Sequence, residues 1–143
     1  MDFSGEVAEW QRNVSEGKAG NIRRYAVLEG LEVRSGKSYL DVGCGGGYLV
    51  REVGNAAGIE GRVVGNDSSP QMVENAQAIC QGLANVSIIE GTAAAIPSDD
   101  AQFDGLAALQ VYEYVEDVSG ALKEARRVLR AGCPIAIVSI LWE

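Results

Sequence analysis

Apolar runs and amphipathic stretches alternate along this chain, and together they predict strands and helices in turn. The apolar runs predict strands at about residues 39–42, 62–66, 86–89, 103–110 and 134–141. Helical spacing of apolar residues predicts helices from about residue 49, over residues 70–82 and over residues 117–130, after two earlier helices at residues 2–12 and 20–31. This alternation predicts an α/β fold, a doubly wound and mostly parallel sheet with right-handed crossovers.

The pattern also predicts which faces are buried. In the helix over residues 117–130, the apolar side chains that share one face are Val118, Leu122, Ala125 and Leu129, so we expect that face to pack on the sheet. Residues 134–141 are almost continuously apolar, which predicts a strand buried on both faces.

Four glycines in five positions follow the first strand, at Gly43, Gly45, Gly46 and Gly47. Glycine permits positive φ and close backbone approach, and the next helix would direct its free N–H groups at an anionic ligand. Asp67 ends the second strand, Thr92 follows the third, and Gln110 ends the fourth. Because ligands of parallel sheets bind outside the carboxyl ends of the strands, one cleft is predicted to collect these residues.

Length and charge narrow the possible partners. The 143 residues, 47% of them hydrophobic, fit a single domain, which we divide into a helical cap over residues 1–36 and an α/β core over residues 37–143. The net charge of −8 argues against nucleic acid and anionic membranes as partners. No apolar leader or long apolar span is evident, so we expect a cytoplasmic protein.

Cysteine and histidine content narrows the chemistry. Three widely spaced cysteines fit neither a disulfide framework nor a zinc site, and no metal is expected. The chain has no histidine, which excludes every histidine-based triad, base or metal site.

Asp41, Gly43, Gly45 and Gly47 spell D-x-G-x-G-x-G, which resembles the first motif of class I S-adenosylmethionine-dependent methyltransferases. Residues 66–72, 91–97 with 103–104, and 128–132 resemble further segments of that family in the same order, so the resemblance covers about residues 37–141. The branch that the sequence most resembles methylates small molecules and includes quinone-biosynthesis C-methyltransferases.

The resemblance implies a site for S-adenosylmethionine, with roles for ten residues. Asp41, Gly43, Gly45, Gly47 and Gln110 would hold the methionine part, with Asp41 near its ammonium group; Asp67 would accept hydrogen bonds from the ribose hydroxyls; Ser68, Met72, Thr92 and Ala93 would surround the adenine. Thr92 stands where the family commonly has an aspartate.

The acceptor would approach after the fourth strand, where Tyr112, Glu113 and Tyr114 follow. The tyrosine rings could face the sulfonium cation, and Glu113 is the candidate base if the acceptor must lose a proton. A surface turn or a helix start is an equally good interpretation of the same triplet.

Two other functions remain open at this stage. An NAD-type oxidoreductase would need G-x-G-x-x-G, but Tyr48 and Val50 occupy the positions of the third glycine in the two possible registers. A non-catalytic S-adenosylmethionine-binding module, or a fragment of a longer methyltransferase, would fit a sheet that lacks the family's last two strands. The fifth strand would then be an exposed apolar edge, which predicts self-association or a partner chain.

Overall fold

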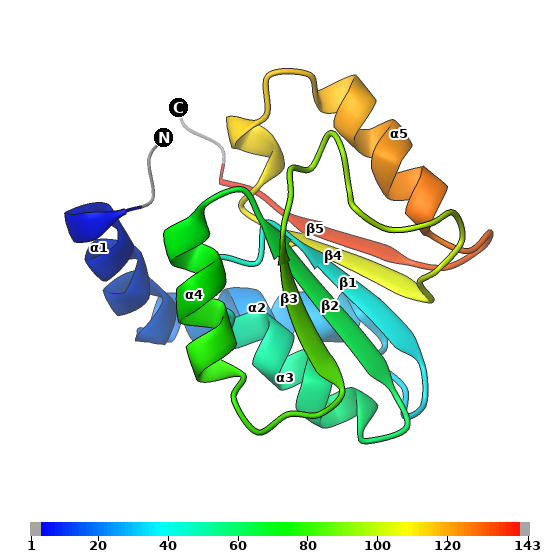
Figure 1. Ribbon diagram of the computed structural model, residues 1–143, viewed down its shortest axis with the longest axis horizontal. Coiled ribbons are helices and arrows are strands. Elements are labelled where there is room, and N and C mark those ends of the chain that lie inside the picture. Colours follow the sequence, from blue (N-terminus) through cyan, green and yellow to red (C-terminus); the bar gives the residue numbers. More distant parts are fainter. Residues whose placement is uncertain (1–3, 141–143) are drawn as a thin grey trace.

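A five-stranded parallel sheet forms the centre of the computed structural model, which describes residues 4–140 (Figure 1). The strands are β1 (Ser38–Val42), β2 (Arg62–Asp67), β3 (Val86–Glu90), β4 (Gly105–Leu109) and β5 (Ile135–Val138), in the order β3-β2-β1-β4-β5. The helices are α1 (Gly5–Glu16), α2 (Lys18–Leu31), α3 (Tyr48–Ala57), α4 (Pro70–Ile79) and α5 (Val118–Val128), with a 3₁₀ turn η1 (Tyr112–Tyr114). The predicted α/β fold is confirmed.

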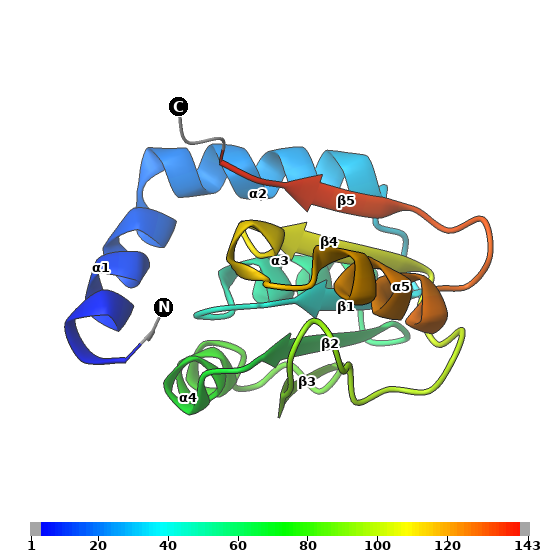
Figure 2. The same cartoon turned by 90° about the horizontal axis from the view of Figure 1, so that it is seen from above.

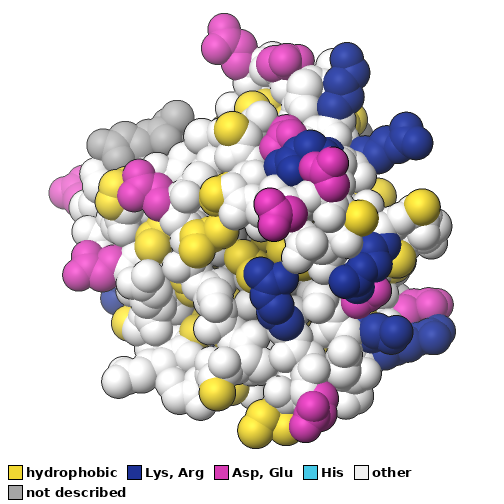
Figure 3. Space-filling view, turned by 45° about the vertical axis from the view of Figure 1, so that its right-hand side comes forward, with side chains coloured by type: hydrophobic (Ala, Val, Ile, Leu, Met, Phe, Trp, Pro, Cys, Tyr) yellow, Lys and Arg dark blue, Asp and Glu magenta, His cyan; other side chains and the backbone are white. Residues whose placement is uncertain are grey.

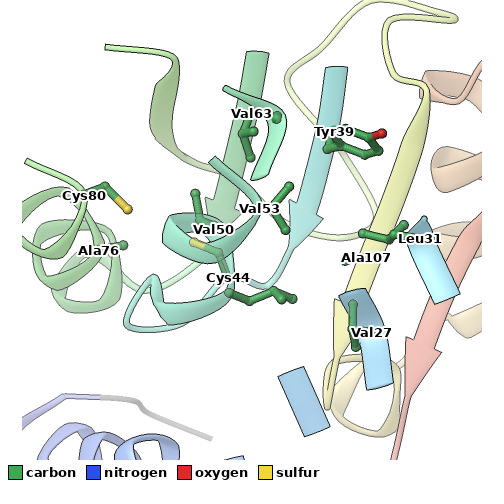
Figure 4. Packing of buried hydrophobic residues seen from close by; sticks show 12 residues of the cluster. Val27, Leu31, Tyr39, Cys44, Val50, Val53, Val63, Ala76, Cys80 and Ala107 are labelled. Carbon is green, nitrogen blue, oxygen red and sulfur yellow. The ribbon is translucent and has the colours of Figure 1, made fainter. Parts of the chain in front are cut away.

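Helices cover both faces of the sheet. The side chains of α2, α3 and α4 form one apolar cluster with the sheet, and α5 forms a second cluster on the opposite face (Figure 1). Figure 4 shows the first cluster, in which Val50 and Val53 of α3 lie among side chains from β2, α2 and α4. This two-sided burial fixes β1 at the centre, where Leu40 and Val42 are fully buried.

The face predicted to be buried in the helix over residues 117–130 is right for Ala125 and Leu129, which pack in the cluster beneath α5, and wrong for Val118 and Leu122. In α5 the buried side chains are Ala121, Ala125 and Val128, while Val118 and Leu122 are 39% and 41% exposed. The alanines allow the helix axis to approach the sheet closely, so the face with the small residues packs inward.

The fifth strand was expected to be buried on both faces, and this expectation was wrong. Strand β5 lies at the edge of the sheet, and its Ile135 and Ile137 are each 43% exposed. Helix α2 covers one face of β5 through Ala136 and Val138, and no described residue buries the two isoleucines on the other face. The strand is therefore half-buried instead of covered on both faces.

Parallel strands place all their carboxyl ends at one edge of the sheet, where the glycine corner also lies. Figure 2 shows α1 beyond that edge, connected to α2 at an angle. Helix α1 extends beyond the predicted range to Glu16, and Gly17 separates it from α2. The two helices thus reach the strand ends that the sequence identified as a candidate cleft.

Candidate functional site

A cavity of about 640 Å³ lies at the carboxyl ends of the strands, within the usual volume range of small-molecule sites. The predicted site residues that line it are Asp41, Gly43, Gly45, Asp67, Ser68, Met72, Thr92, Ala93 and Gln110. Gly47, Tyr112 and Glu113 do not line it. The glycine corner and the carboxylate that ends β2 therefore open onto the same space.

The glycine corner contacts Asp67 directly. The backbone N–H of Gly45 donates to Oδ2 of Asp67 at 2.9 Å, and the N–H of Ser69 donates to Oδ1 at 2.9 Å. Gly43 and Gly45 have φ values of +63° and +53°, and a Cβ on Gly43 would lie 2.6 Å from Cγ2 of Val111. These contacts explain why the loop needs glycine and hold the Asp67 carboxylate at the mouth of the corner.

Gly47 has a structural task of its own. Its φ is +87°, and a Cβ there would lie 2.8 Å from both Cα and Cβ of Ala76 in α4. This glycine lets α3 begin close against α4 and faces away from the cavity.

Asp41 is a buried carboxylate that lacks a full set of partners. Asp41 is 3% exposed and lines the cavity, and its Oδ1 has no hydrogen-bond partner within residues 4–140. Burial, and then the negative charge of Asp67, raise the pKa of Asp41 well above its usual value. A cationic group in the cavity would supply the missing partner.

The wall at β2 and β3 combines an apolar side chain with a polar turn. Met72 is 1% exposed and lies in the first turn of α4, where its backbone N–H donates to the capping oxygen of Ser69 at 3.4 Å. Thr92 lines the cavity, but its hydroxyl oxygen accepts a hydrogen bond from the N–H of Ala95 at 3.1 Å. Thr92 therefore shapes the turn as well as the cavity wall.

Helices α1 and α2 supply a cavity wall that the sequence motifs did not indicate. Trp10, Val14 and Ser15 come from α1, and Arg23 and Arg24 from α2. The only sequence signal for them was helical spacing, which predicts the two helices but not which of their side chains reach the cavity.

Arg24 and Tyr48 attach these helices to the core. Arg24 is buried and donates to Oε1 of Glu52 at 2.8 Å and to the carbonyl oxygen of Ser15 at 2.5 Å. Its guanidinium also lies 5.4 Å from the ring centre of Tyr48, whose hydroxyl donates to Oε1 of Glu16 at 2.6 Å. Burial and the hydrogen bond to Glu16 raise the pKa of Tyr48 to about 12. The contacts hold α1 and α2 over the strand ends.

The structure does not bring Tyr112 and Glu113 to the cavity. Tyr112 is 7% exposed and packs in the cluster beneath α5, and no described residue forms a hydrogen bond with its hydroxyl. Both carboxylate oxygens of Glu113 are likewise buried without a hydrogen-bond partner in the described part of the chain. The tight turn of η1 directs Tyr112 into the core and places Tyr114, from the same triplet, at the cavity.

The surface is mixed in charge, and Figure 3 shows Lys and Arg side chains interspersed with Asp and Glu on one face. Arg127 of α5 pairs with Asp100 and Glu124, and Arg130, just after that helix, pairs with Asp104. Within residues 4–140, no group of His, Cys, Asp or Glu side chains is arranged to hold a metal ion. None of the helices in that range has the length and apolar character needed to cross a membrane.

Comparison with known proteins identifies the family. The sequence model of the methyltransferase domain family matches residues 40–137. The chain therefore belongs to this family, as a class I S-adenosylmethionine-dependent methyltransferase domain. This assignment favours a methyl donor over the dinucleotide that the glycine loop had left open.

Three relatives illustrate the similarity. An uncharacterized 37.1 kDa protein in a transposon of Streptomyces fradiae is 37% identical over 125 residues, 87% of this chain and 36% of the relative. Demethylmenaquinone methyltransferase of Staphylococcus carnosus is 29% identical over 84% of this chain and 50% of the relative. A SAM-dependent methyltransferase of Aquifex aeolicus superposes with a TM-score of 0.81 at 22% identity, over 92% of this chain and 72% of that one. The chain thus spans half or less of the length of the two curated relatives.

Proposed function

We propose that this chain binds S-adenosylmethionine across the carboxyl ends of β1, β2 and β4 and takes part in methyl transfer to a small-molecule acceptor. The observation that carries the proposal is the contact between Gly45 and Asp67, because it joins the backbone corner and the β2 carboxylate in one cavity. Such a pair suits a ligand with a ribose at one end and an amino acid at the other.

Each end of that ligand has candidate partners. Asp67 would accept hydrogen bonds from the ribose hydroxyls, since a carboxylate has lone pairs beyond the two used by Gly45 and Ser69. Met72, Ser68 and the backbone of Ala93 line the cavity on the adenine side. Asp41 would accept from the ammonium group and so gain the partner that its Oδ1 lacks.

Catalysis in such a site depends on position more than on proton transfer. When bound, the sulfonium of the cofactor supplies the methyl group, which passes to an acceptor held in line with the S–CH₃ bond. Helices α1 and α2 cover the strand ends and would exclude water from this space. Tyr112 and Glu113 do not line the cavity, so neither would contact the acceptor. Tyr114 is the aromatic side chain of η1 that an acceptor would contact.

A small apolar acceptor fits the remaining wall. Trp10, Tyr114, Val115 and Ile140 also line the cavity and offer apolar contact. The Staphylococcus carnosus relative carries the name of an enzyme that acts on demethylmenaquinone, which supports a small organic acceptor for this chain too. We also propose that the protein is cytoplasmic, because Cys44, Cys80 and Cys133 are all free thiols, as is usual in a reducing compartment.

Calorimetric titration with S-adenosylhomocysteine, the product form of the cofactor, tests the site. Asp67→Ala should weaken binding by about 10–100-fold, the loss expected for hydrogen bonds to a charged acceptor. Asp99→Ala removes the same charge from an exposed position outside the cavity and should bind like the wild type. Circular dichroism checks that both variants fold. Unchanged affinity in a folded Asp67→Ala variant would contradict the site assignment.

The second candidate is a cofactor-binding module without activity of its own. The position of Tyr112 and Glu113 off the cavity favours it, because Glu113, the base expected from the sequence, then does not reach an acceptor. Transfer of a radiolabelled methyl group to demethylmenaquinone-like and other small acceptors distinguishes the two functions. Tight S-adenosylhomocysteine binding without transfer to any of them would support the module.

A further inference from the structure

Thr92 begins the turn that follows β3, and its oxygen atoms are largely engaged within the protein. Its carbonyl oxygen accepts from Nδ2 of Asn66 at 3.4 Å and from the backbone N–H of Ala95 at 3.3 Å. Its hydroxyl oxygen accepts from the same N–H at 3.1 Å. What Thr92 can still offer to a ligand in the cavity is therefore a neutral hydroxyl group with one lone pair and one hydrogen.

The next two backbone N–H groups of the turn are uncommitted. Ala93 and Ala94 both line the cavity, and neither N–H donates a hydrogen bond to another group within residues 4–140. A ligand edge that lies against this turn can thus receive hydrogen bonds from the backbone. The turn suits atoms that accept hydrogen bonds, such as the ring nitrogens of a purine.

The carboxylates of the cavity have other tasks. Among the described residues that line it, Asp41 and Asp67 are the acidic ones. In the proposed function Asp41 binds the ammonium group and Asp67 binds the ribose, and the N–H groups of Gly45 and Ser69 hold the Asp67 carboxylate in place. No carboxylate of the cavity is then left for the 6-amino group of adenine.

Adenine carries two kinds of hydrogen-bonding group on its edge, ring nitrogens that accept and a 6-amino group that donates. The N–H groups of Ala93 and Ala94 match the ring nitrogens, whereas the amino group finds no charged acceptor. Hydrogen bonds to a charged group are roughly twice as strong as those between neutral groups. Loss of the 6-amino group should therefore cost little affinity at this site.

We propose that Thr92 sets the nucleobase specificity of this site, and that this neutral residue makes the site tolerate methyl donors whose purine lacks the 6-amino group. The inference rests on the proposed function and adds to it a determinant of specificity in the turn after β3. Thr92 is exposed as well as cavity-lining, so a single substitution can introduce a charged acceptor without repacking the core.

The test pairs two ligands with three proteins. One ligand is S-adenosylhomocysteine, and the other is its analogue with purine in place of adenine, which lacks only the 6-amino group. Calorimetry would measure both with the wild type and with Thr92→Asp, whose carboxylate can accept from the N–H of Ala95 with one oxygen and from the amino group with the other. Ala95→Asp puts the same charge on the same turn, at an exposed residue that does not line the cavity, and is the control.

The wild type should bind the two ligands with dissociation constants within about three-fold of each other, and Ala95→Asp should keep that ratio. Thr92→Asp should bind S-adenosylhomocysteine about ten-fold or more tightly than the purine analogue, because its carboxylate accepts from the amino group.

A wild type that prefers S-adenosylhomocysteine by more than about three-fold would overturn the role of Thr92 while leaving the proposed function intact. A folded Thr92→Asp variant without the new preference would overturn it equally. The wild-type comparison needs no variant, so it still decides if Thr92→Asp fails to fold. If neither ligand binds the wild type, the proposed function fails together with the inference.

Discussion

Replacing Asp41 by asparagine should stabilise the free protein and weaken its binding of the cofactor. Asp41 is 3% exposed, its Oδ1 has no partner among the described residues, and the negative charge of Asp67 adds to the effect of burial in raising its pKa. An ionised carboxylate in such a place is a cost to the folded state that a bound ammonium group would offset. Asp41→Asn removes the charge and keeps the shape.

The size of the effect follows from the desolvation of one unsatisfied buried group, about 1–3 kcal/mol. The sign follows from the raised pKa of Asp41 in the folded state. Below the ordinary pKa of about 3.9, the residue is protonated in both states and carries no penalty. As the pH rises from there through the raised pKa, wild-type stability is lost, so the advantage of Asp41→Asn should grow from acidic to neutral pH.

Urea-induced unfolding of wild type and Asp41→Asn, measured between pH 5 and pH 8, gives this difference directly. Calorimetry at pH 7 should show S-adenosylhomocysteine binding to the variant at least about ten-fold more weakly, because a neutral amide replaces the partner of its ammonium group. A variant that is less stable than the wild type at pH 7 would refute the reasoning, since it would mean that the carboxylate is paired in the folded protein.

Three other substitutions test the scaffold. Gly47→Ala should lower the free energy of unfolding by about 2–5 kcal/mol in urea titrations, because it combines a left-handed φ with overlap against Ala76; a loss under 1 kcal/mol would contradict this packing. Tyr48→Phe removes the hydrogen bond to Glu16, so the free energy of unfolding should fall by about 0.5–1.5 kcal/mol and hydrogen exchange in α1 should become faster. Unchanged exchange in α1 would show that this hydrogen bond does not hold the helix. Ile137→Lys should reduce concentration-dependent association measured by sedimentation, because β5 is an exposed apolar edge strand. A wild type that stays monomeric at all concentrations would contradict association through β5.

The carboxyl-end cleft was predictable because it needs only chain order. Once strands alternate with helices in a parallel sheet, the residues that end the strands must share one edge. Asp67 and Gln110 could be placed at the cavity on this basis alone, and both line it. Their placement at the cavity does not depend on how the side chains pack.

Residues whose direction depends on tertiary packing could not be placed in this way. Gly47 belongs to the same motif as Gly45 but faces Ala76, and only the approach of α4 to α3 decides that. Arg23 and Trp10 line the cavity because of the way α1 and α2 cross the strand ends. The buried ion pair between Arg24 and Glu52 holds α2 in that position.

Helical spacing placed Ala125 on the buried face of α5 correctly, but it also placed Val118 and Leu122 there, and both are exposed. Val118 and Leu122 have the larger side chains, yet Ala121 and Ala125 are the residues in contact with the sheet. Small side chains allow the closer approach of helix and sheet, and hydrophobic periodicity alone does not register that distance.

Because every cavity residue from the sheet comes from the carboxyl ends of the strands, the opposite rim is available for engineering. The turn before β2 belongs to that rim, and Ile59 in it is 84% exposed. A fluorophore or surface linker attached at Ile59 would leave the ligand entrance open, so the molecule could be immobilised as a sensor for adenosyl compounds with its recognition end facing the solution.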